Sequence, residues 1–550
     1  MAIPDDPDRP TNFTCRLSQG SNAFAHFWEL TVGSDHAPIA LRADWQAQLR
    51  RRHDELGFRY VRFHGLLSDD MGTLIVNQDK FLYSFFNIDQ IFDFLLLIGM
   101  RPFVELSFMP AALASGGTTV FRYAGNVTPP KDYAQWAALI VRLVAHWAQR
   151  YDVAEVRDWL FEVWNEPKLN DFWIGTRSEY FDHYRHTVRA IKSVDAEFKV
   201  GGPATAKNAW VAEFVEFCSS NNLPVDFVST HHYPTDALGH ESDDTESQLA
   251  HSHRSILREQ AVQAQRQARG RAPHYIEWNT SSNPRDALYD EPYAAAFVTK
   301  TVMEAQGLVQ GYSFWTFSDI FAENYFPSVP FHGGFGLLSL HGIAKPMYRA
   351  FELLHRLGHE PLPVQGEHPT VDVWVVRNAT GLTALASKHA LPRHSIKTRR
   401  LRIALSAAPA PRSMVMERID ADHAKGGRKS QYPIFGRTTG RIAALLLACV
   451  ARHTALGAPC TASRQRTQKR YIDHFRLPNA KALRQAMGCP EYLDDFQRQR
   501  LNDASALRPQ AQAWSYDNGS VPIEFSVPPH GVAAITVVLA DAMAEREAQP

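Results

Sequence analysis

Short apolar runs alternate with helical patterns along the first two thirds of the chain. Eight runs rich in β-branched and aromatic residues stand out, at 23–30, 60–65, 101–108, 160–167, 198–203, 226–234, 274–281 and 311–319. The runs are almost continuously apolar, which is typical of parallel strands that are buried on both faces. Eight such strands separated by helices are the number needed for a (β/α)8 TIM barrel. We therefore predict an α/β fold with a barrel over residues 21–355.

The segments between these runs show the period of amphipathic helices. Two of them place their large apolar residues on a single face, first Tyr133, Trp136, Ile140, Leu143 and Trp147, and then Phe181, Tyr184, Val188 and Ile191. An apolar stripe of this width allows a helix to cover the outside of a barrel. Both segments are predicted to be barrel helices.

The pattern changes after residue 355. The stretches 370–390 and 521–540 read as β-rich runs joined by turn residues, which predicts antiparallel strands. We expect residues 356–550 to form an accessory β-sandwich domain, and residues 1–20 to supply a strand that packs on it. A basic insertion at about 425–478 interrupts this domain. Within it, residues 425–476 contain eleven Lys and Arg residues against one acidic residue.

The charge balance argues against several classes of partner. Lys and Arg together number 58, as do Asp and Glu, so no net field favours nucleic acid or an anionic membrane. The longest aliphatic run, residues 442–451, is too short to cross a bilayer. The first residues lack the pattern of a signal peptide, and the five cysteines are irregularly spaced. These features predict a soluble cytoplasmic protein without a nucleic-acid or membrane partner, and they leave its oligomeric state open.

Polar and aromatic side chains gather at the C-terminal ends of the predicted strands. They are His64, Glu105, Glu166, His231, Tyr233, Glu277, Trp315 and Asp319. In a barrel these ends converge on one mouth, where catalysis takes place. Glu166 in the stretch WNEP and Glu277 in the stretch IEWN stand out, because a carboxylate is costly to bury unless it is paired or has a chemical role.

Two carboxyl groups that face one bond are the requirement for glycoside hydrolysis. One acid protonates the leaving oxygen, and the other group attacks the sugar or activates water; a separation of about 5 Å gives retention and a wider one inversion. Asn165 is suited to bind a sugar hydroxyl beside the reacting carbon. We expect Arg62 and Tyr233 to keep Glu277 ionised, and a drier environment to raise the pKa of Glu166.

The neighbouring residues also have structural explanations. His64 could be a hydrogen-bonded core histidine, and Trp315 could pack in the core rather than against a sugar ring. His36 stands evenly between a structural and a binding role. Glu105 could pair with Arg62 as a structural bridge, so it is left out of the predicted site.

Six stretches resemble glycoside hydrolase family 39, and specifically its bacterial β-xylosidases. In chain order they are VRFHGLLSDDMG, WNEP, STHHYPTD, IEWNTSSNP, FWTFSDIF and PFHGGFGLLSLHGIAKP. The likeness runs from residue 23 to 355, and a weaker similarity continues beyond. The chain departs from the family at Ala322, where an acidic residue often stands beside the one at Glu323.

The resemblance implies a (β/α)8 barrel with a β-sandwich, and an enzyme that releases β-D-xylose from the non-reducing end of xylo-oligosaccharides with retention. It implies that Glu166 is the general acid/base and Glu277 the nucleophile of a double displacement. It also implies that neither a metal nor an organic cofactor is needed. The substrate-binding residues implied or predicted are Asn165, His64, His231, Tyr233, Trp315, Glu323, Phe108 and His36, with Arg62 in support.

Other functions remain open. An α-L-iduronidase uses the same two carboxylates, but its substrate needs a cation, preferably an arginine, and Arg62 is the only clear candidate at the strand ends. Xylose lacks an exocyclic carbon, so bulky residues such as Phe321, Phe326 and Phe331 could close its site. An α-L-arabinosidase activity stays open because arabinose and xylose present similar hydroxyls. A catalytically silent sugar-binding barrel would need neither glutamate.

Overall fold

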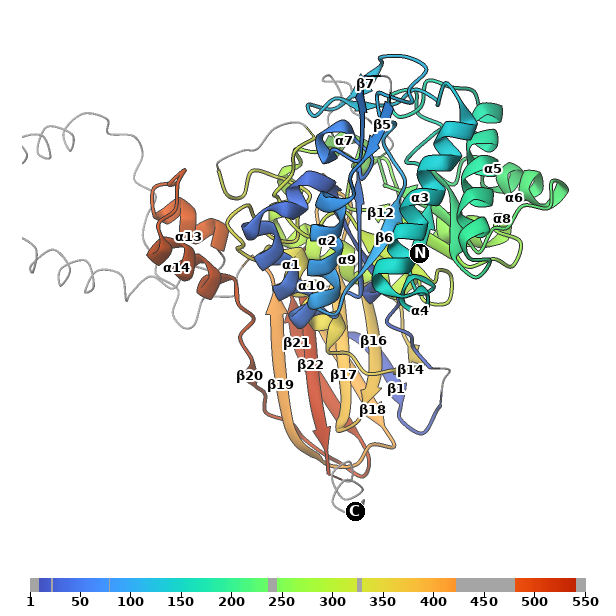
Figure 1. Ribbon diagram of the computed structural model, residues 1–550. Helices are drawn as coiled ribbons and strands as arrows, with labels where there is room; N and C mark the ends of the chain where they lie inside the picture. Colours follow the sequence, from blue (N-terminus) through green and yellow to red (C-terminus); the bar gives the residue numbers. More distant parts are fainter. Residues whose placement is uncertain are drawn as a thin grey trace, which may run out of the picture.

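The computed structural model describes residues 9–20, 23–78, 80–235, 245–323, 329–421 and 480–540. A barrel surrounded by helices occupies one half of the molecule, and long strands form the other half (Figure 1). No helix in these described ranges is long and apolar enough to cross a membrane. The basic insertion predicted at 425–478 lies outside the described residues.

Eight parallel strands close into a barrel. In chain order they are β2 (Thr31–His36), β3 (Tyr60–His64), β6 (Arg101–Glu105), β9 (Leu160–Glu162), β10 (Lys199–Ala206), β11 (Phe227–His232), β12 (Pro273–Trp278) and β13 (Gly311–Phe314). Each strand pairs with the next, and Phe314 of β13 pairs with Val32 of β2 to close the sheet. The strands are buried because helices cover their outside and side chains fill their inside. The predicted (β/α)8 fold is confirmed.

The first barrel strand lies later in the chain than the apolar pattern predicted. Residues 23–30 are not a strand, because Phe27–Glu29 form the 3-10 helix η1 and β2 begins at Thr31. The aromatic run packs into the core as a compact turn, with the ring centroids of Phe24 and Trp28 5.2 Å apart. Polar residues hid the true strand from the pattern, yet all six residues of β2 are buried, and Ser34, Asp35 and His36 each have a hydrogen-bond partner.

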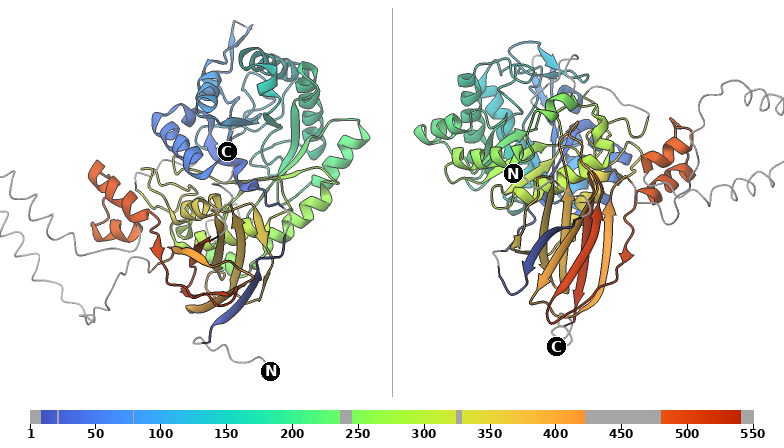
Figure 2. Two further views of the ribbon diagram at one scale, coloured as in Figure 1. Left: turned by 90° about the horizontal axis from the view of Figure 1, so that it is seen from below. Right: turned by 180° about the vertical axis from the view of Figure 1, so that it is seen from behind.

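Helices cover the outside of the barrel (Figure 2). They are α1 (Ala43–Leu56), α2 (Phe86–Leu97), α3 (Tyr133–Tyr151), α4 (Val153–Val156), α5 (Arg177–Val194), α6 (Val211–Ser220), α7 (Thr245–Ala250), α8 (Ile256–Gln267), α9 (Pro292–Glu304) and α10 (Pro346–His355), with the 3-10 helices η2 (Ala37–Leu41), η3 (Asp69–Met71) and η4 (Ala287–Asp290). Thr176 and Glu179 form a capping box that begins α5. Both predicted apolar helix faces are confirmed as buried, in α3 and in α5, apart from the half-buried Tyr133.

Two short hairpins extend from the barrel. One consists of β4 (Leu74–Asn77) and β5 (Lys80–Tyr83), and the other of β7 (Thr119–Val120) and β8 (Gly125–Asn126). The turn of the β7–β8 hairpin reaches the loop after β13, where the N–H of Arg122 donates to the carbonyl oxygen of Glu323 at 3.0 Å. This hairpin therefore borders the mouth of the barrel.

Two sheets form the smaller unit. One contains β15 (Val364–Gln365), β1 (Thr11–Arg16), β18 (Arg399–Ser406) and β21 (Val521–Val527), and the other β14 (Glu360–Leu362), β16 (Val371–Asn378), β17 (Gly381–Lys388), β22 (Val532–Leu539), β19 (Pro411–Ile419) and β20 (Gln510–Ala511). The N-terminal strand β1 runs parallel to β18. Apolar side chains from both sheets share one core, as in a β-sandwich.

Residues 480–505 do not continue the sandwich. They form α13 (Ala480–Ala486) and α14 (Asp495–Ser505), which lie beside the barrel (Figure 1). Leu483 and Leu501 of these helices share an apolar cluster with Phe331. Phe331 is thus part of this interface rather than of the closed sugar site that the sequence suggested.

A buried lysine ties together the loops that follow β12 and β13. Nζ of Lys345 lies 2.7 Å from Oδ2 of Asp319 and 3.1 Å from Oδ1 of Asp290, and it donates to the carbonyl oxygen of Gly334 at 2.8 Å. Burial opposes its charge, but the two aspartates raise the pKa of Lys345 above the usual value. The cation and its two partners therefore act as one unit.

Replacement of Lys345 by methionine should lower the free energy of unfolding by about 3–5 kcal/mol, because it leaves two buried carboxylates without a cation. Urea unfolding followed by tryptophan fluorescence would measure the change. The matched control is Arg177→Met, since its ion pair with Glu213 is half exposed, and it should cost less than about 1 kcal/mol. Equal losses in the two variants would contradict the assigned role of Lys345.

Candidate active site

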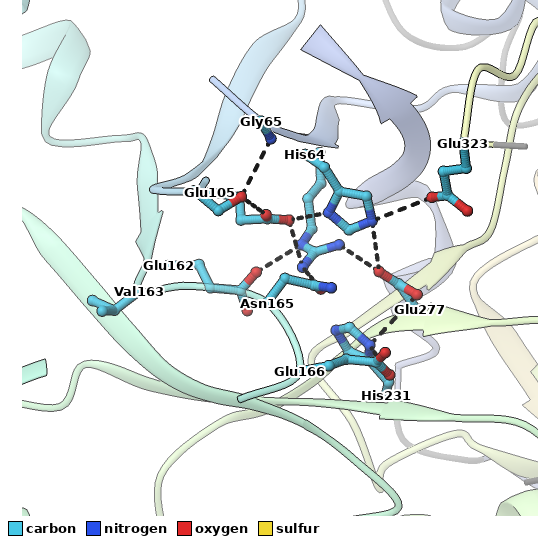
Figure 3. A network of polar contacts seen from close by, with 12 residues as sticks. His64, Gly65, Glu105, Glu162, Val163, Asn165, Glu166, His231, Glu277 and Glu323 are labelled. Carbon is cyan, nitrogen blue, oxygen red and sulfur yellow. Dashed lines mark hydrogen bonds and ion pairs between the residues drawn. The ribbon is translucent and has the colours of Figure 1, made fainter. Parts of the chain in front are cut away.

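Glu166 and Glu277 approach each other at the mouth of the barrel (Figure 3). Glu166 follows β9, Glu277 lies in β12, and His231 of β11 sits between them, with Nδ1 2.9 Å from Oε1 of Glu166 and 3.4 Å from Oε2 of Glu277. One oxygen of each carboxylate and a nitrogen of His231 all lie within 4.8 Å of one another. Among the described residues this trio alone brings donor atoms close enough for a metal ion, and here those atoms face one another as hydrogen-bonding groups.

The backbone after β9 is strained. Trp164 and Glu166 have φ angles of 74° and 43°, in the left-handed region that residues with side chains rarely adopt. The N–H of Glu166 donates to the carbonyl oxygen of Ala204 at 2.9 Å, and Nε1 of Trp164 donates to the carbonyl oxygen of Phe172 at 2.7 Å. Such strain persists only where the surroundings enforce it, and it is typical of functional sites. The packed tryptophan thus helps to direct Glu166 into the mouth.

Burial gives Glu166 and His231 unusual protonation states. It raises the pKa of Glu166 to about 7, although the positive charges of His64 and Arg62 act in the opposite direction. It lowers the pKa of His231 to about 3, so this ring is neutral at neutral pH. A neutral imidazole carries one N–H, and Nδ1, which faces both carboxylates, is the nitrogen suited to donate. Glu166 can therefore hold a proton near neutral pH.

Arg62 of β3 is the centre of a buried charge network. Its Nη1 donates to Oε1 of Glu277 at 2.8 Å, and its Nε donates to Oε2 of Glu162 at 2.6 Å. Its Nη2 donates to Oδ1 of Asn165 at 2.9 Å and lies 2.7 Å from Oε2 of Glu105. The guanidinium is fully buried, where charge pairs interact more strongly than in water. All three predicted members of this group, Arg62, Asn165 and Glu277, are brought together.

Both oxygens of Glu277 are held. Arg62 and His64 face Oε1, with Nε2 of His64 at 3.5 Å, while the hydroxyl of Tyr233 donates to Oε2 at 3.1 Å. The opposite nitrogen of His64 lies 2.7 Å from Oε2 of Glu105. Burial opposes the charge of His64, but Glu105 raises the pKa of this histidine. Glu105 was left out of the predicted site, but it orients His64, which was included.

Three further predicted residues, Glu323, Trp315 and Phe108, lie near His64. Oε1 of Glu323 is 3.8 Å from Nε2 of His64. The rings of Trp315 and Phe108 are 4.9 Å and 6.2 Å from the ring of His64, and both side chains are buried. Trp315 and Phe108 therefore shape the site from behind His64.

His36 is buried beside His64, with which it is paired in the register of β2 and β3. Its Nε2 is 2.7 Å from Oδ2 of Asp70, and its ring stacks on the ring of Tyr123 with the two centroids 3.6 Å apart. Sequence reasoning did not find Tyr123, which comes from a hairpin without a strand-end pattern. It also missed Asp35 and Glu162, although both are acidic residues within barrel strands. Asp35 escaped notice because the first strand was placed at 23–30.

Known proteins resemble the chain over most of its length. Residues 15–437 match Glycosyl hydrolases family 39. A beta-xylosidase of Caldicellulosiruptor saccharolyticus is 43% identical over 517 residues, which cover 93% of this chain and 95% of the relative, and one of Geobacillus stearothermophilus is 42% identical over 363 residues, 64% and 72% of the two chains. The crystal structure of a monomeric beta-xylosidase from Caulobacter crescentus has a TM-score of 0.75 at 28% identity, with 96% of this chain and 99% of that chain covered. This chain belongs to glycosyl hydrolase family 39 and is a glycoside hydrolase.

Proposed function

We propose that this glycoside hydrolase is a retaining β-xylosidase that removes β-D-xylose from the non-reducing end of xylo-oligosaccharides. The observation that carries the proposal is the spacing of Glu166 and Glu277, which bring one oxygen each within 4.8 Å. Retaining enzymes hold their two carboxyl groups about 5 Å apart, whereas inverting enzymes leave roughly 6.5–9.5 Å for a water molecule. The similarity to beta-xylosidases supports the choice of sugar.

In the first step Glu277 forms a bond to the sugar. One of its carboxylate oxygens attacks the anomeric carbon, and the bond from that carbon to the leaving oxygen breaks. Glu166 gives its proton to the leaving oxygen, so the leaving group departs as a neutral alcohol. Arg62 and Tyr233 orient Glu277, because they donate to its two oxygens at 2.8 and 3.1 Å.

In the second step water releases the sugar. Glu166, now ionised, takes a proton from water while the water oxygen attacks the anomeric carbon. The ester bond to Glu277 breaks, its carboxylate is regenerated, and the two inversions give retention. His231 suits both steps, because its neutral ring donates to Glu166 without the positive charge that would keep Glu166 ionised.

The contacts of Arg62 favour a neutral sugar. A uronic acid, the substrate of an α-L-iduronidase, needs a cation for its own carboxylate. Arg62 already donates to Glu162, Glu277 and Asn165. Phe321 lies 6.2 Å from Trp315 and adds bulk near the site, as suits a ring without an exocyclic carbon, while Phe326 lies outside the described residues.

The wild-type protein should hydrolyse p-nitrophenyl β-D-xylopyranoside faster than the matching α-L-iduronide and α-L-arabinopyranoside. Glu277→Ala should reduce turnover of the xyloside to near background, because it removes the carboxylate that forms the glycosyl ester. Release of p-nitrophenol measures both effects. The control is Glu197→Ala, whose side chain is 70% exposed and which should behave as wild type. If the iduronide were hydrolysed faster, the roles of the two glutamates would stand but the proposed substrate would be wrong.

Glu166→Ala should slow the hydrolysis of xylosides with poor leaving groups by about 10²–10⁴-fold. The first step with activated aryl xylosides should keep its rate, because their leaving groups depart without a proton. Azide should speed the second step, because it attacks the glycosyl ester without a general base, and the product should be β-xylosyl azide. Product configuration is read by NMR. Equal losses for good and poor leaving groups, or an α-configured azide, would remove Glu166 from the acid/base role.

Glu166→Gln should stabilise the protein at high pH. The folded protein holds the Glu166 proton up to about pH 7, whereas an unfolded glutamate loses it near 4.5, so this group's contribution to stability falls as the pH rises between these values. Relative to wild type, the variant should gain about 2–3 kcal/mol between pH 5 and 8. Urea unfolding at both pH values would measure it, and Glu197→Gln should show no such gain. A constant difference would contradict the raised pKa.

A further inference from the structure

A second pair of buried carboxyl groups lies beside the proposed reaction site. Asp35 of β2 is 1% exposed, and Glu323, in the loop after β13, is 9% exposed. Oε1 of Glu323 is 3.8 Å from Nε2 of His64, and the same nitrogen is 3.5 Å from Oε1 of Glu277 (Figure 3). One nitrogen of His64 therefore faces both Glu323 and the proposed nucleophile.

The two oxygens of Asp35 have different partners. Oδ2 accepts a hydrogen bond from the backbone N–H of Ala322. Oδ1 is buried, and no donor among the described residues reaches it while both carboxyl groups are ionised. The two carboxyl groups interact, since each acts on the pKa of the other. A proton held by one of them would supply the donor that this buried pair lacks.

Glu323 is the better holder of this proton. Burial raises its pKa well above the usual value, and the negative charges of Asp35, Glu277 and Glu166 act in the same direction. Burial also raises the pKa of Asp35 to about 6, but backbone N–H groups and His64 oppose that rise. Two carboxyl groups this close in a dry site titrate as a pair that retains one proton over a range of pH.

We propose that Asp35 is a positioning residue that holds the carboxyl group of Glu323 in place to bind a hydroxyl of the sugar. This inference rests on the proposed function, because it concerns the sugar-binding side of the same site. The O–H of Glu323 donates to Asp35, which leaves the second oxygen of Glu323 to accept from a sugar hydroxyl. The backbone of Glu323 is held as well, by the hydrogen bond from Arg122.

Loss of the shared proton would disrupt this arrangement. Two adjacent buried carboxylates repel each other, so Glu323 would turn away from Asp35 and bind sugar less well. Other ionisable groups surround the pair, and they are His36 of β2, His64 of β3, Asp70 of η3, Glu105 of β6, Tyr123 of the β7–β8 hairpin, Glu166 after β9 and Glu277 of β12. The rate of turnover also depends on Glu166, so it does not report on this pair alone. The effect of pH must therefore be measured on sugar binding, with variants of Asp35 and Glu323.

The test is the inhibition constant of D-xylose against p-nitrophenyl β-D-xylopyranoside between pH 6 and 9.5. In wild type this constant should rise by up to about tenfold for each pH unit above the pKa of the pair, because the singly protonated pair declines at that rate. Asp35→Asn keeps an acceptor for the N–H of Ala322 and offers an amide donor to an ionised Glu323. Above pH 8, where Glu166 is already ionised, the inhibition constant of this variant should no longer rise with pH.

Glu323→Gln provides a second test, because its amide donates to Asp35 as the protonated acid does, and its curve should also be flat above pH 8. Asp70→Asn is the matched control. It removes a nearby carboxyl group whose pKa burial raises to about 6 but which contacts His36 instead, and it should keep the wild-type pH dependence.

A flat wild-type curve would overturn the role of Asp35. So would a wild-type pH dependence in both Asp35→Asn and Glu323→Gln, even while the xyloside is hydrolysed normally. A wild-type protein that neither hydrolyses the xyloside nor is inhibited by xylose would overturn the proposed function instead, and this inference with it.

Discussion

One buried guanidinium is the interaction on which the rest of the site depends. Arg62 contacts Glu105, Glu162 and Glu277 from a fully buried position, and these three carboxylates would otherwise repel one another inside the barrel. Burial opposes its charge, but the three partners raise its pKa, so the cation is permanent. The planar fork donates in three directions at once, which a lysine could not do. The strands β3, β6, β9 and β12 are thereby linked at their C-terminal ends.

The acidic residues of the mouth lie at different distances from Arg62, and this difference separates their roles. Glu277 binds Arg62 directly and is suited to act as a carboxylate. Glu166 hydrogen-bonds to the neutral ring of His231, and its pKa rises to about 7 because burial outweighs the more distant charges. Glu323 faces a carboxylate in Asp35, and its pKa is raised well above the usual value. A single barrel mouth can thus hold a charged and a neutral carboxyl group within a few ångströms, as acid/base catalysis requires.

The sequence alone was sufficient to predict the barrel and to place Glu166 and Glu277 at the mouth where the structure brings them together. Period-2 and period-3.6 patterns depend on which residues are buried, and a barrel buries its strands and helix faces in a regular way. The exception was the first strand. Aromatic residues at 23–30 pack as a turn, while Asp35 and His36 of β2 are buried with hydrogen-bond partners from distant parts of the chain. A local pattern contains no information about such partners.

What the sequence by itself determined, then, is the alternation of strands and helices in the barrel and the positions of Glu166 and Glu277 near strand ends, because both follow from local patterns. The tertiary structure alone decided which side chains meet. Glu105 joins Arg62 and His64, Asp35 meets Glu323 across the closure of the barrel, and α13 and α14 lie against the barrel rather than in the sandwich. The physical reason is that charge states depend on burial and on neighbours a few ångströms away, and residues far apart in the chain become neighbours only when the barrel closes.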